Sequence, residues 1–235
     1  MQYQAILFDL DGTLLPMDQD LFLKAYFSAL VKKLAPLGYD PKALTDAIWA
    51  GTGAMIHNDG QRTNEAAFWD CFARILGEQA RREAPVLEAF YHNEFQQVRH
   101  VCGYTSAAKE LLDALKAKGL RRILATNPLF PAIATESRIR WAGLEPSDFE
   151  LYTTYENSRY CKPNPAYYRD ILTAAGLSPE ECIMVGNDVG DDMVARKLGM
   201  GVFLLTDCLI NHTEEPIDAY PHGGFPQLAA FLDAL

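Results

Sequence analysis

The chain has 235 residues, of which 49% are hydrophobic and 22% charged, enough for one large globular domain or a domain with an insert. Its formal net charge of −10 argues against binding to nucleic acid or to an anionic membrane surface, because both require a basic face. No run reaches the roughly 18 apolar residues of a membrane-spanning helix, and no signal peptide precedes the first apolar strand.

The five cysteines are dispersed, odd in number and without a CxxC pair. We therefore expect reduced thiols in a cytoplasmic protein, rather than a zinc site or a disulfide framework. The five histidines likewise form no pair at metal-ligand spacing.

The first predicted strand covers residues 3–8 and stops at a cluster of Asp, Gly and Thr. Residues 18–99 favour helices, since apolar residues recur at helical spacing within 21–38, 64–79 and 84–98. The polar segment 49–64 is the longest part of this stretch without helical character. Such a loop is either functional or only solvated.

Beyond Gly103 the pattern alternates between strand and helix. Helices are predicted at 105–119, 132–141, 164–175 and 193–198, and strands at 121–127, 151–154, 182–188 and 201–207. This alternation predicts an α/β fold with a doubly wound, mostly parallel Rossmann-like sheet. The helical stretch is then an insertion between the first and second elements of the α/β domain. We therefore expect a catalytic core of 1–16 and 104–235 and a separate all-helical cap domain of 17–103.

Four polar segments follow predicted strands: 9–13, 126–127, the region up to Lys162, and 187–192. In an open parallel sheet, ligands bind outside the carboxyl ends of the strands. We therefore expect these segments, although far apart in sequence, to meet in one crevice.

Asp9 and Asp11 place two carboxylates two residues apart directly after the first strand. Such a pair repels unless a cation lies between its members, and Mg²⁺ is the usual cation at phosphoryl sites. Asp9 can then attack phosphorus as the nucleophile, while Asp11 protonates the leaving oxygen and later activates water. The alternative is an ordinary Asp-Gly turn after an edge strand.

Thr126 and Asn127 supply a hydroxyl and a backbone N–H suited to a phosphoryl oxygen, although Thr at a strand end is often a helix cap. Lys162 lies beside Pro163 and can neutralise a transferring phosphoryl group, although a lysine alone is more often a surface residue. The segment 186–192 contains three aspartates, which favours metal binding over a solvated acidic loop.

In this order the four segments resemble the motifs of the haloacid dehalogenase-like hydrolases: DxDGT at 9–13, a Thr at 126, a Lys-Pro at 162–163 and an acidic strand end. The helical stretch resembles the family's cap, so the likeness covers essentially the whole chain. The resemblance implies that Asp9 is the nucleophile and Asp11 the acid/base. Thr126 and Lys162 would bind phosphate, and the first and fourth motifs would bind Mg²⁺.

The fourth motif departs from the family pattern, because Asn187 follows Gly186 where Gly-Asp is usual. Counting back from the helix at Met193 aligns Asp188 with the leading acid and Asp192 with the trailing one. Asp188 then joins Asp9 and Asp11 as a direct metal ligand, and Asp192 acts through water or on Lys162. The reverse register gives the metal contact to Asn187.

Asp11 also distinguishes this chain from the dehalogenases of the family, which lack the second acid because a halide needs no proton. Sugar phosphomutases keep it but typically carry a His in the first cap helix. The corresponding position here is Leu21, which favours hydrolysis.

The sequence therefore predicts a Mg²⁺-dependent phosphatase that acts on a small phosphorylated metabolite through an aspartyl-phosphate, as a monomer or homodimer, without nucleic acid or membrane partners. A sugar phosphomutase, or a catalytically silent binding protein on this fold, remains an alternative. A phosphoryl group presents few features, so we expect the insert to select the substrate. Arg62 and Asn58 are candidates for that contact, unless their loop is only solvated.

Overall fold

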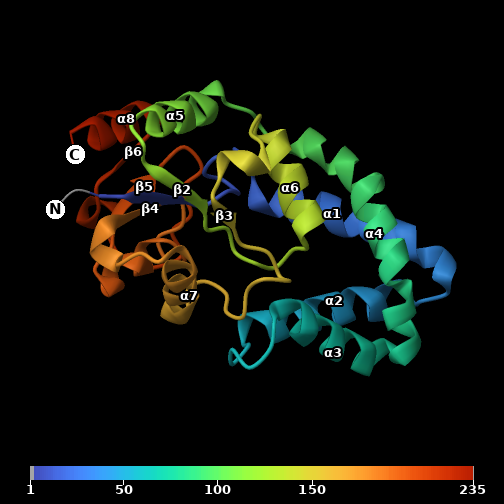
Figure 1. Cartoon of the computed structure of the whole chain (residues 1–235). Coiled ribbons are helices and arrows are strands. Elements are labelled where there is room, and N and C mark those ends of the chain that lie inside the picture. Colours follow the sequence, from blue (N-terminus) through green and yellow to red (C-terminus); the bar gives the residue numbers. More distant parts are fainter. Residues whose placement is uncertain (1–2, 235) are drawn as a thin grey trace.

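The computed structural model describes residues 3–234 and contains one sheet of six parallel strands in the order β3–β2–β1–β4–β5–β6 (Figure 1). The strands are β1 (Ala5–Phe8), β2 (Arg121–Leu124), β3 (Leu151–Tyr152), β4 (Cys182–Gly186), β5 (Gly201–Leu205) and β6 (His222–Gly223). Because every pairing is parallel, the predicted α/β, Rossmann-like sheet is confirmed.

Helices cover both faces of this sheet. Ile6 and Phe8 of β1 pack in the same buried cluster as α5 (Ser106–Ala117) and α8 (Phe225–Asp233), which lie side by side in Figure 1. Ala5 and Leu7 point to the opposite face and pack with α7 (Pro165–Ala175). Burial on both faces explains why the central strands read as continuous apolar runs rather than as an alternation.

The segment between β1 and β2 is helical, as predicted. It comprises α1 (Gln19–Leu34), η1 (Ala35–Leu37), α2 (Pro41–Ile56), α3 (Asn64–Leu76), η2 (Glu78–Glu83), α4 (Ala84–His92) and η3 (Glu94–Val101), where η denotes a 3₁₀ helix. These helices, called the insert below, lie on the side of the molecule away from both termini (Figure 1). No helix within residues 3–234 is long and apolar enough to cross a membrane.

The prediction that residues 49–64 lack helical character is wrong for 49–56, because α2 continues to Ile56, whereas 57–63 form a loop between α2 and α3. Asp40 caps this helix by accepting a hydrogen bond from the Ala43 amide. A Cβ at Gly51 would lie 2.6 Å from the Phe68 ring of α3. The glycine therefore permits close packing of α2 on α3 and does not end the helix.

The remaining elements are α6 (Ala132–Trp141) and η6 (Met193–Leu198), which lie where helices were predicted, and the short η4 (Pro146–Asp148), η5 (Pro179–Glu181) and η7 (Ile217–Ala219), which were not predicted. The helix predicted over 84–98 ends at His92, where the Asn93 amide donates to the Ala89 carbonyl and a 3₁₀ helix follows. The helix predicted over 193–198 is also 3₁₀. Finally, β6 and α8 were not predicted.

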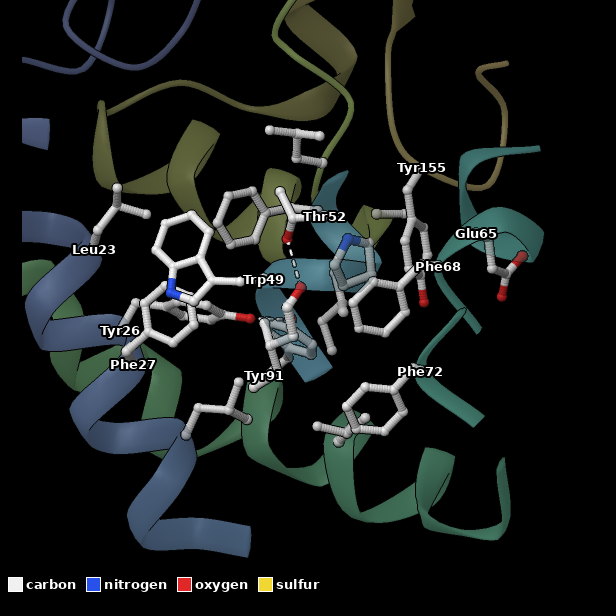
Figure 2. A pocket seen from close by; sticks show the side chains of 18 of the residues that line it. Leu23, Tyr26, Phe27, Trp49, Thr52, Glu65, Phe68, Phe72, Tyr91 and Tyr155 are labelled. Carbon is white, nitrogen blue, oxygen red and sulfur yellow. Dashed lines mark hydrogen bonds between the residues drawn. The ribbon is translucent and has the colours of Figure 1, made fainter. Parts of the chain in front are cut away.

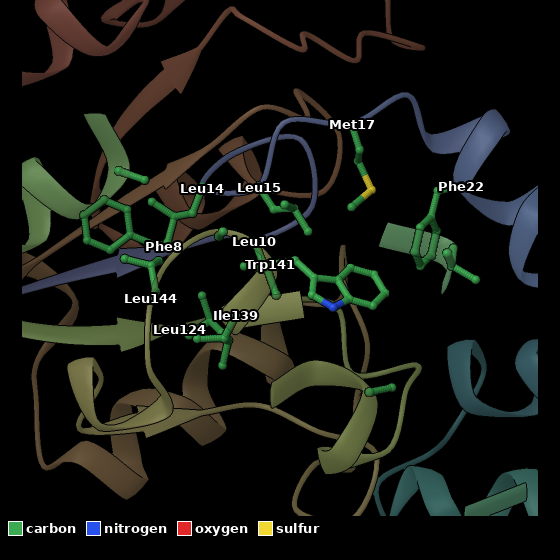
Figure 3. Close-up of a cluster of buried hydrophobic side chains, with 14 of the residues drawn as sticks. Phe8, Leu10, Leu14, Leu15, Met17, Phe22, Leu124, Ile139, Trp141 and Leu144 are labelled. Atoms are coloured by element: carbon green, nitrogen blue, oxygen red, sulfur yellow. The ribbon is translucent and has the colours of Figure 1, made fainter. Parts of the chain in front are cut away.

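One buried cluster connects the sheet to the insert. Figure 3 shows it running from Phe8 and Leu124 past Trp141 to Phe22 of α1. Further into the insert, the Phe95 ring of η3 lies 5.0 Å from Trp141 of α6, measured between ring centroids. The insert is thus held to the sheet by aromatic packing as well as by the chain connections.

This packing predicts that Phe95→Ala lowers the free energy of unfolding by about 3–5 kcal/mol, because a fully buried ring leaves a cavity between η3 and α6. Leu21→Ala, at a side chain that is 53% exposed, should change it by less than about 0.5 kcal/mol. Urea denaturation of both variants measures the difference. A cost for Phe95→Ala no larger than for Leu21→Ala would contradict this account of the contact.

Candidate active site

The carboxyl ends of β1, β2 and β4 share one edge of the sheet, because β1 lies between the other two strands. The chain order reverses at this point, and ligands of open α/β sheets bind at such a reversal. The segments that follow these strands are 9–13, 126–127 and 187–192, and the loop that carries Lys162 joins them there. The predicted convergence of the four segments is therefore present in the fold.

Lys162 is the centre of this convergence. Its ammonium group donates to Asp9 Oδ1 at 2.8 Å and to Asp192 Oδ1 at 2.6 Å, and the side chain is almost fully buried. Burial by itself lowers the pKa of Lys162, but the Asp192 and Asp9 carboxylates outweigh it and hold that pKa well above its usual value. Lys162 is thus charged, and Asp192 contacts it directly, as the sequence suggested.

Asn187 and Thr13 connect the first and fourth motifs. The Thr13 hydroxyl contacts Asp9 Oδ2 at 3.2 Å and Asn187 Oδ1 at 2.9 Å, and Asn187 Nδ2 donates to the Cys208 carbonyl. Gly12 has a φ of +84°, and a Cβ there would lie 2.3 Å from Asn187 Nδ2. Only glycine fits this position, since both the positive φ and the close approach exclude a side chain.

The Asp188 carboxylate is partly used by its own loop. Its Oδ1 accepts hydrogen bonds from the amides of Gly190 and Asp191, at 2.7 and 2.9 Å. Within the described chain, no protein donor contacts its second oxygen. Asp191 accepts from the Asn127 side chain at 3.3 Å, which ties the second motif to the fourth.

Thr126 is buried just beyond the end of β2. Its carbonyl accepts hydrogen bonds from the Thr153 and Tyr167 hydroxyls at 2.6 and 2.8 Å, which fixes the backbone at the end of β2. Its own hydroxyl has no hydrogen-bond partner among residues 3–234. Asn127 Oδ1 accepts a hydrogen bond from the Lys162 amide at 3.3 Å, so its carboxamide helps to hold the loop that carries Lys162.

Asp11 pairs with Arg138 of α6, a contact that was not predicted. The guanidinium donates to Asp11 Oδ2, while Asp11 Oδ1 is buried and has no partner within the described residues. Burial raises the pKa of the Asp11 carboxyl; the Arg138 charge opposes this shift and the Asp9 charge adds to it. The net upward shift suits a group that must hold a proton before donating it.

The helical spacing of Arg138 relative to apolar residues could have indicated that its side chain is buried. Arg138 lies four positions after Ala134 and three before Trp141, both of which are buried, so the three share one face of α6. The Arg138 side chain is fully buried and its guanidinium lies 4.4 Å from the centroid of the Phe130 ring. An arginine among apolar positions on a helix face therefore indicates a buried charge that needs an acidic partner.

The chemistry of the site fits a hard divalent cation. Five aspartates follow the neighbouring strands β1 and β4: Asp9, Asp11, Asp188, Asp191 and Asp192. Lys162 and Arg138 are the cations that contact them, which leaves an excess of negative charge. Within residues 3–234, no group of three or more His, Cys, Asp or Glu side chains is arranged so that it could hold a metal ion. Mg²⁺ suits such a site, because it usually keeps several waters and needs only one or two carboxylates.

A cavity of about 570 Å³ begins at Asp11 and extends into the insert. Figure 2 shows its wall, which includes Trp49 and Thr52 of α2, Phe68 of α3 and Tyr26 of α1. Asn58 and Arg62 do not line it. The Asn58 amide bonds to Asn64 and to the Arg62 carbonyl, and the Arg62 guanidinium pairs with Asp70.

The sequence profile of the haloacid dehalogenase-like hydrolases matches residues 3–199. A phosphoglycolate phosphatase from Aliivibrio fischeri is 28% identical over 220 residues, covering 92% of this chain and 89% of its own. The pyrophosphatase PpaX from Bacillus velezensis is 26% identical over 195 residues, covering 83% and 79%. A 2-haloacid dehalogenase structure from Pseudomonas syringae pv. tomato superposes with a TM-score of 0.65 at 20% identity, over 99% of both chains.

The chain belongs to the haloacid dehalogenase-like hydrolase family. The family is one of hydrolases, and the two curated relatives above are named as a phosphoglycolate phosphatase and a pyrophosphatase. The structural match to a dehalogenase shows the shared fold alone.

The Asp11–Arg138 pair predicts a double-mutant result. Arg138→Met should lower the free energy of unfolding by about 3–5 kcal/mol, because it leaves the Asp11 carboxylate without its buried partner. In an Asp11→Asn background the same change should cost at least about 1 kcal/mol less. Urea denaturation measures the four proteins of this cycle. Arg140→Met on the same helix, at a half-exposed side chain, serves as the control. Equal costs in the two backgrounds would contradict the pairing.

Proposed function

We propose that this enzyme hydrolyses small phosphate monoesters with Asp9 as nucleophile and Mg²⁺ as cofactor. The observation that carries the proposal is the contact of the buried Lys162 ammonium with both Asp9 and Asp192. This contact fixes a charged lysine beside a carboxylate at the carboxyl edge of the sheet. A phosphoryl group bound there would face a nucleophile, a cation and the free Thr126 hydroxyl together.

In the proposed reaction, an Asp9 oxygen attacks phosphorus and the bond between phosphorus and the leaving oxygen breaks. Asp11 gives its proton to that oxygen, so the alcohol departs neutral and Asp9 carries the phosphoryl group. Water then attacks the same phosphorus and loses a proton to Asp11, which releases inorganic phosphate and restores Asp9. Lys162 and Thr126 bind the phosphoryl oxygens in both steps.

Asp9, Asp11 and Asp188 would hold the metal, with Asp188 offering its second oxygen. When bound, Mg²⁺ supplies positive charge that relieves repulsion among the carboxylates and between them and the phosphoryl group. Asn187 is the alternative ligand. Its Oδ1 accepts a hydrogen bond from the Thr13 hydroxyl, which also contacts Asp9. The role of Asp188 and that of Asn187 can be separated by experiment.

Two further observations support hydrolysis by a cap-bearing phosphatase. Among residues 3–234, no histidine lines the cavity next to Asp11, which disfavours the phosphomutase alternative. Every element from α1 to η3 is a helix, and the cavity that these helices line also reaches Asp11, so we retain the proposed division into a core of 1–16 and 104–235 and a cap of 17–103. All five cysteines are free thiols in the described chain, which fits the proposed cytoplasmic location.

Asp9→Asn should abolish turnover while the protein stays folded, because an amide is a poor nucleophile and a weaker metal ligand. Phosphate release from p-nitrophenyl phosphate measures turnover, and circular dichroism checks the fold. Asp113→Asn, on the surface of α5, should keep normal activity. Appreciable turnover by a contaminant-free Asp9→Asn sample would rule out the aspartyl-phosphate.

Chelation should remove activity, and Mg²⁺ should restore it better than Ca²⁺, which prefers a larger and less regular ligand shell. Asp188→Ala should raise the Mg²⁺ concentration needed for half-maximal activity more than Asn187→Ala does. The opposite order would transfer the ligand role to Asn187. Full activity after exhaustive chelation would exclude the metal altogether.

A further inference from the structure

The cavity next to Asp11 is where the rest of a substrate would lie. It passes from Asp11 between the helices of the insert and is closed on the core side by residues 129–133 and 155–156. Its volume of about 570 Å³ falls within the ~300–1,000 Å³ typical of sites for drug-sized ligands. A leaving group of two or three carbons would leave most of this space unfilled.

The wall of the cavity is largely aromatic, and the hydroxyl groups of three of its residues bond within the protein. The Tyr26 and Tyr91 hydroxyls pair with each other at 2.9 Å, and the Thr52 hydroxyl donates to the Ile48 carbonyl at 2.9 Å. Near the opening, the Phe27 and half-exposed Trp49 rings stack with centroids 4.9 Å apart. Such a wall favours an apolar or aromatic group over a small polar one.

The charged residues of the wall are all acidic. Beyond Asp11 they are Glu65, Glu88 and Glu156, and within residues 3–234 no lysine, arginine or histidine lines the cavity. Arg138 lies behind the Phe130 ring and is engaged with Asp11. Burial and the Glu156 charge both raise the pKa of Glu65. An anionic leaving group would lose hydration here and meet only like charge.

We infer that the enzyme acts on phosphate monoesters of bulky apolar or aromatic alcohols that carry no acidic group, an inference that rests on the phosphatase function proposed above. A neutral or amine-bearing leaving group matches the acidic wall. The curated relatives are named for phosphoglycolate and pyrophosphate activity, whose leaving groups are small and anionic. This chain therefore differs from them in its substrate class.

A matched pair of esters tests the inference. The probes are 3-phenylpropyl phosphate and 3-(4-carboxyphenyl)propyl phosphate, which share an alkyl leaving oxygen and differ in one distant carboxylate. We expect kcat/KM for the uncharged ester to be at least about tenfold higher, the scale of one mismatched contact in a binding pocket. Phosphoglycolate should be poorer than 3-phenylpropyl phosphate by a similar factor. Phosphate release with Mg²⁺ present measures all three.

Two variants then assign the preference to the cavity. Glu65→Lys should narrow the ratio between the paired esters at least several-fold, because it places a cation on the acidic wall. Glu110→Lys makes the same charge change on α5, outside the cavity, and should leave the ratio unaltered. Glu65→Gln removes the charge with little change in shape and should narrow the ratio in the same direction, which serves if Glu65→Lys does not fold.

The outcomes separate this inference from the proposed function. Hydrolysis of p-nitrophenyl phosphate together with equal or better use of phosphoglycolate or the carboxylated ester would overturn the substrate class alone. A ratio that responds equally to Glu65→Lys and Glu110→Lys would also overturn it, because the cavity would not be its source. No phosphate release from any ester would overturn the phosphatase function, and the inference with it.

Discussion

The burial of the Lys162 ammonium between Asp9 and Asp192 is the interaction on which the arrangement of the site depends. A buried charge is tolerated only when it is paired, so the loop that carries Lys162 must come to the carboxyl edge of β1 and β4. Gly186 makes room for this, since a Cβ there would lie 2.1 Å from Asp192 Oδ2. Arg138 plays the equivalent part for Asp11. Each of the two buried cations thus fixes the position of a carboxylate that the proposed chemistry uses.

The sequence predicted the parts of the site that follow from chain order. Asp9, Thr126 and the 187–192 segment each follow an apolar strand, and parallel strands carry their carboxyl ends to one edge. Arg138 could not be predicted in the same way, because its partner lies 127 positions earlier and only the folded packing brings the two together. The orientation of the Asp188 carboxylate could not be predicted from the sequence either, because it depends on which amides of its own loop donate to it.

Within the insert the sequence located the helices but not the cavity between them. The polarity of residues 49–64 predicted a substrate contact there. In the structure, however, the Asn58 side chain donates to the Arg62 carbonyl, and the Arg62 guanidinium donates to Asp70. The aromatic residues of α1–α4 recur at helical spacing, a pattern typical of core packing. A periodic pattern gives the direction of a side chain but does not say whether it fills a space or borders one. Phe68 and Tyr26 border the cavity, and only the packing reveals it.

The cavity and Asp11 belong to one packed unit. Phe130 lines the cavity, and its ring also lies against the guanidinium that holds Asp11. A leaving group seated on that wall therefore lies against a ring that packs directly on the Asp11–Arg138 pair. Binding energy from a remote part of a substrate accelerates a reaction only when it is used at the reacting centre. In this fold one ring, that of Phe130, borders the cavity proposed for the leaving group and also packs on the arginine that pairs with Asp11, the residue proposed to protonate the leaving oxygen.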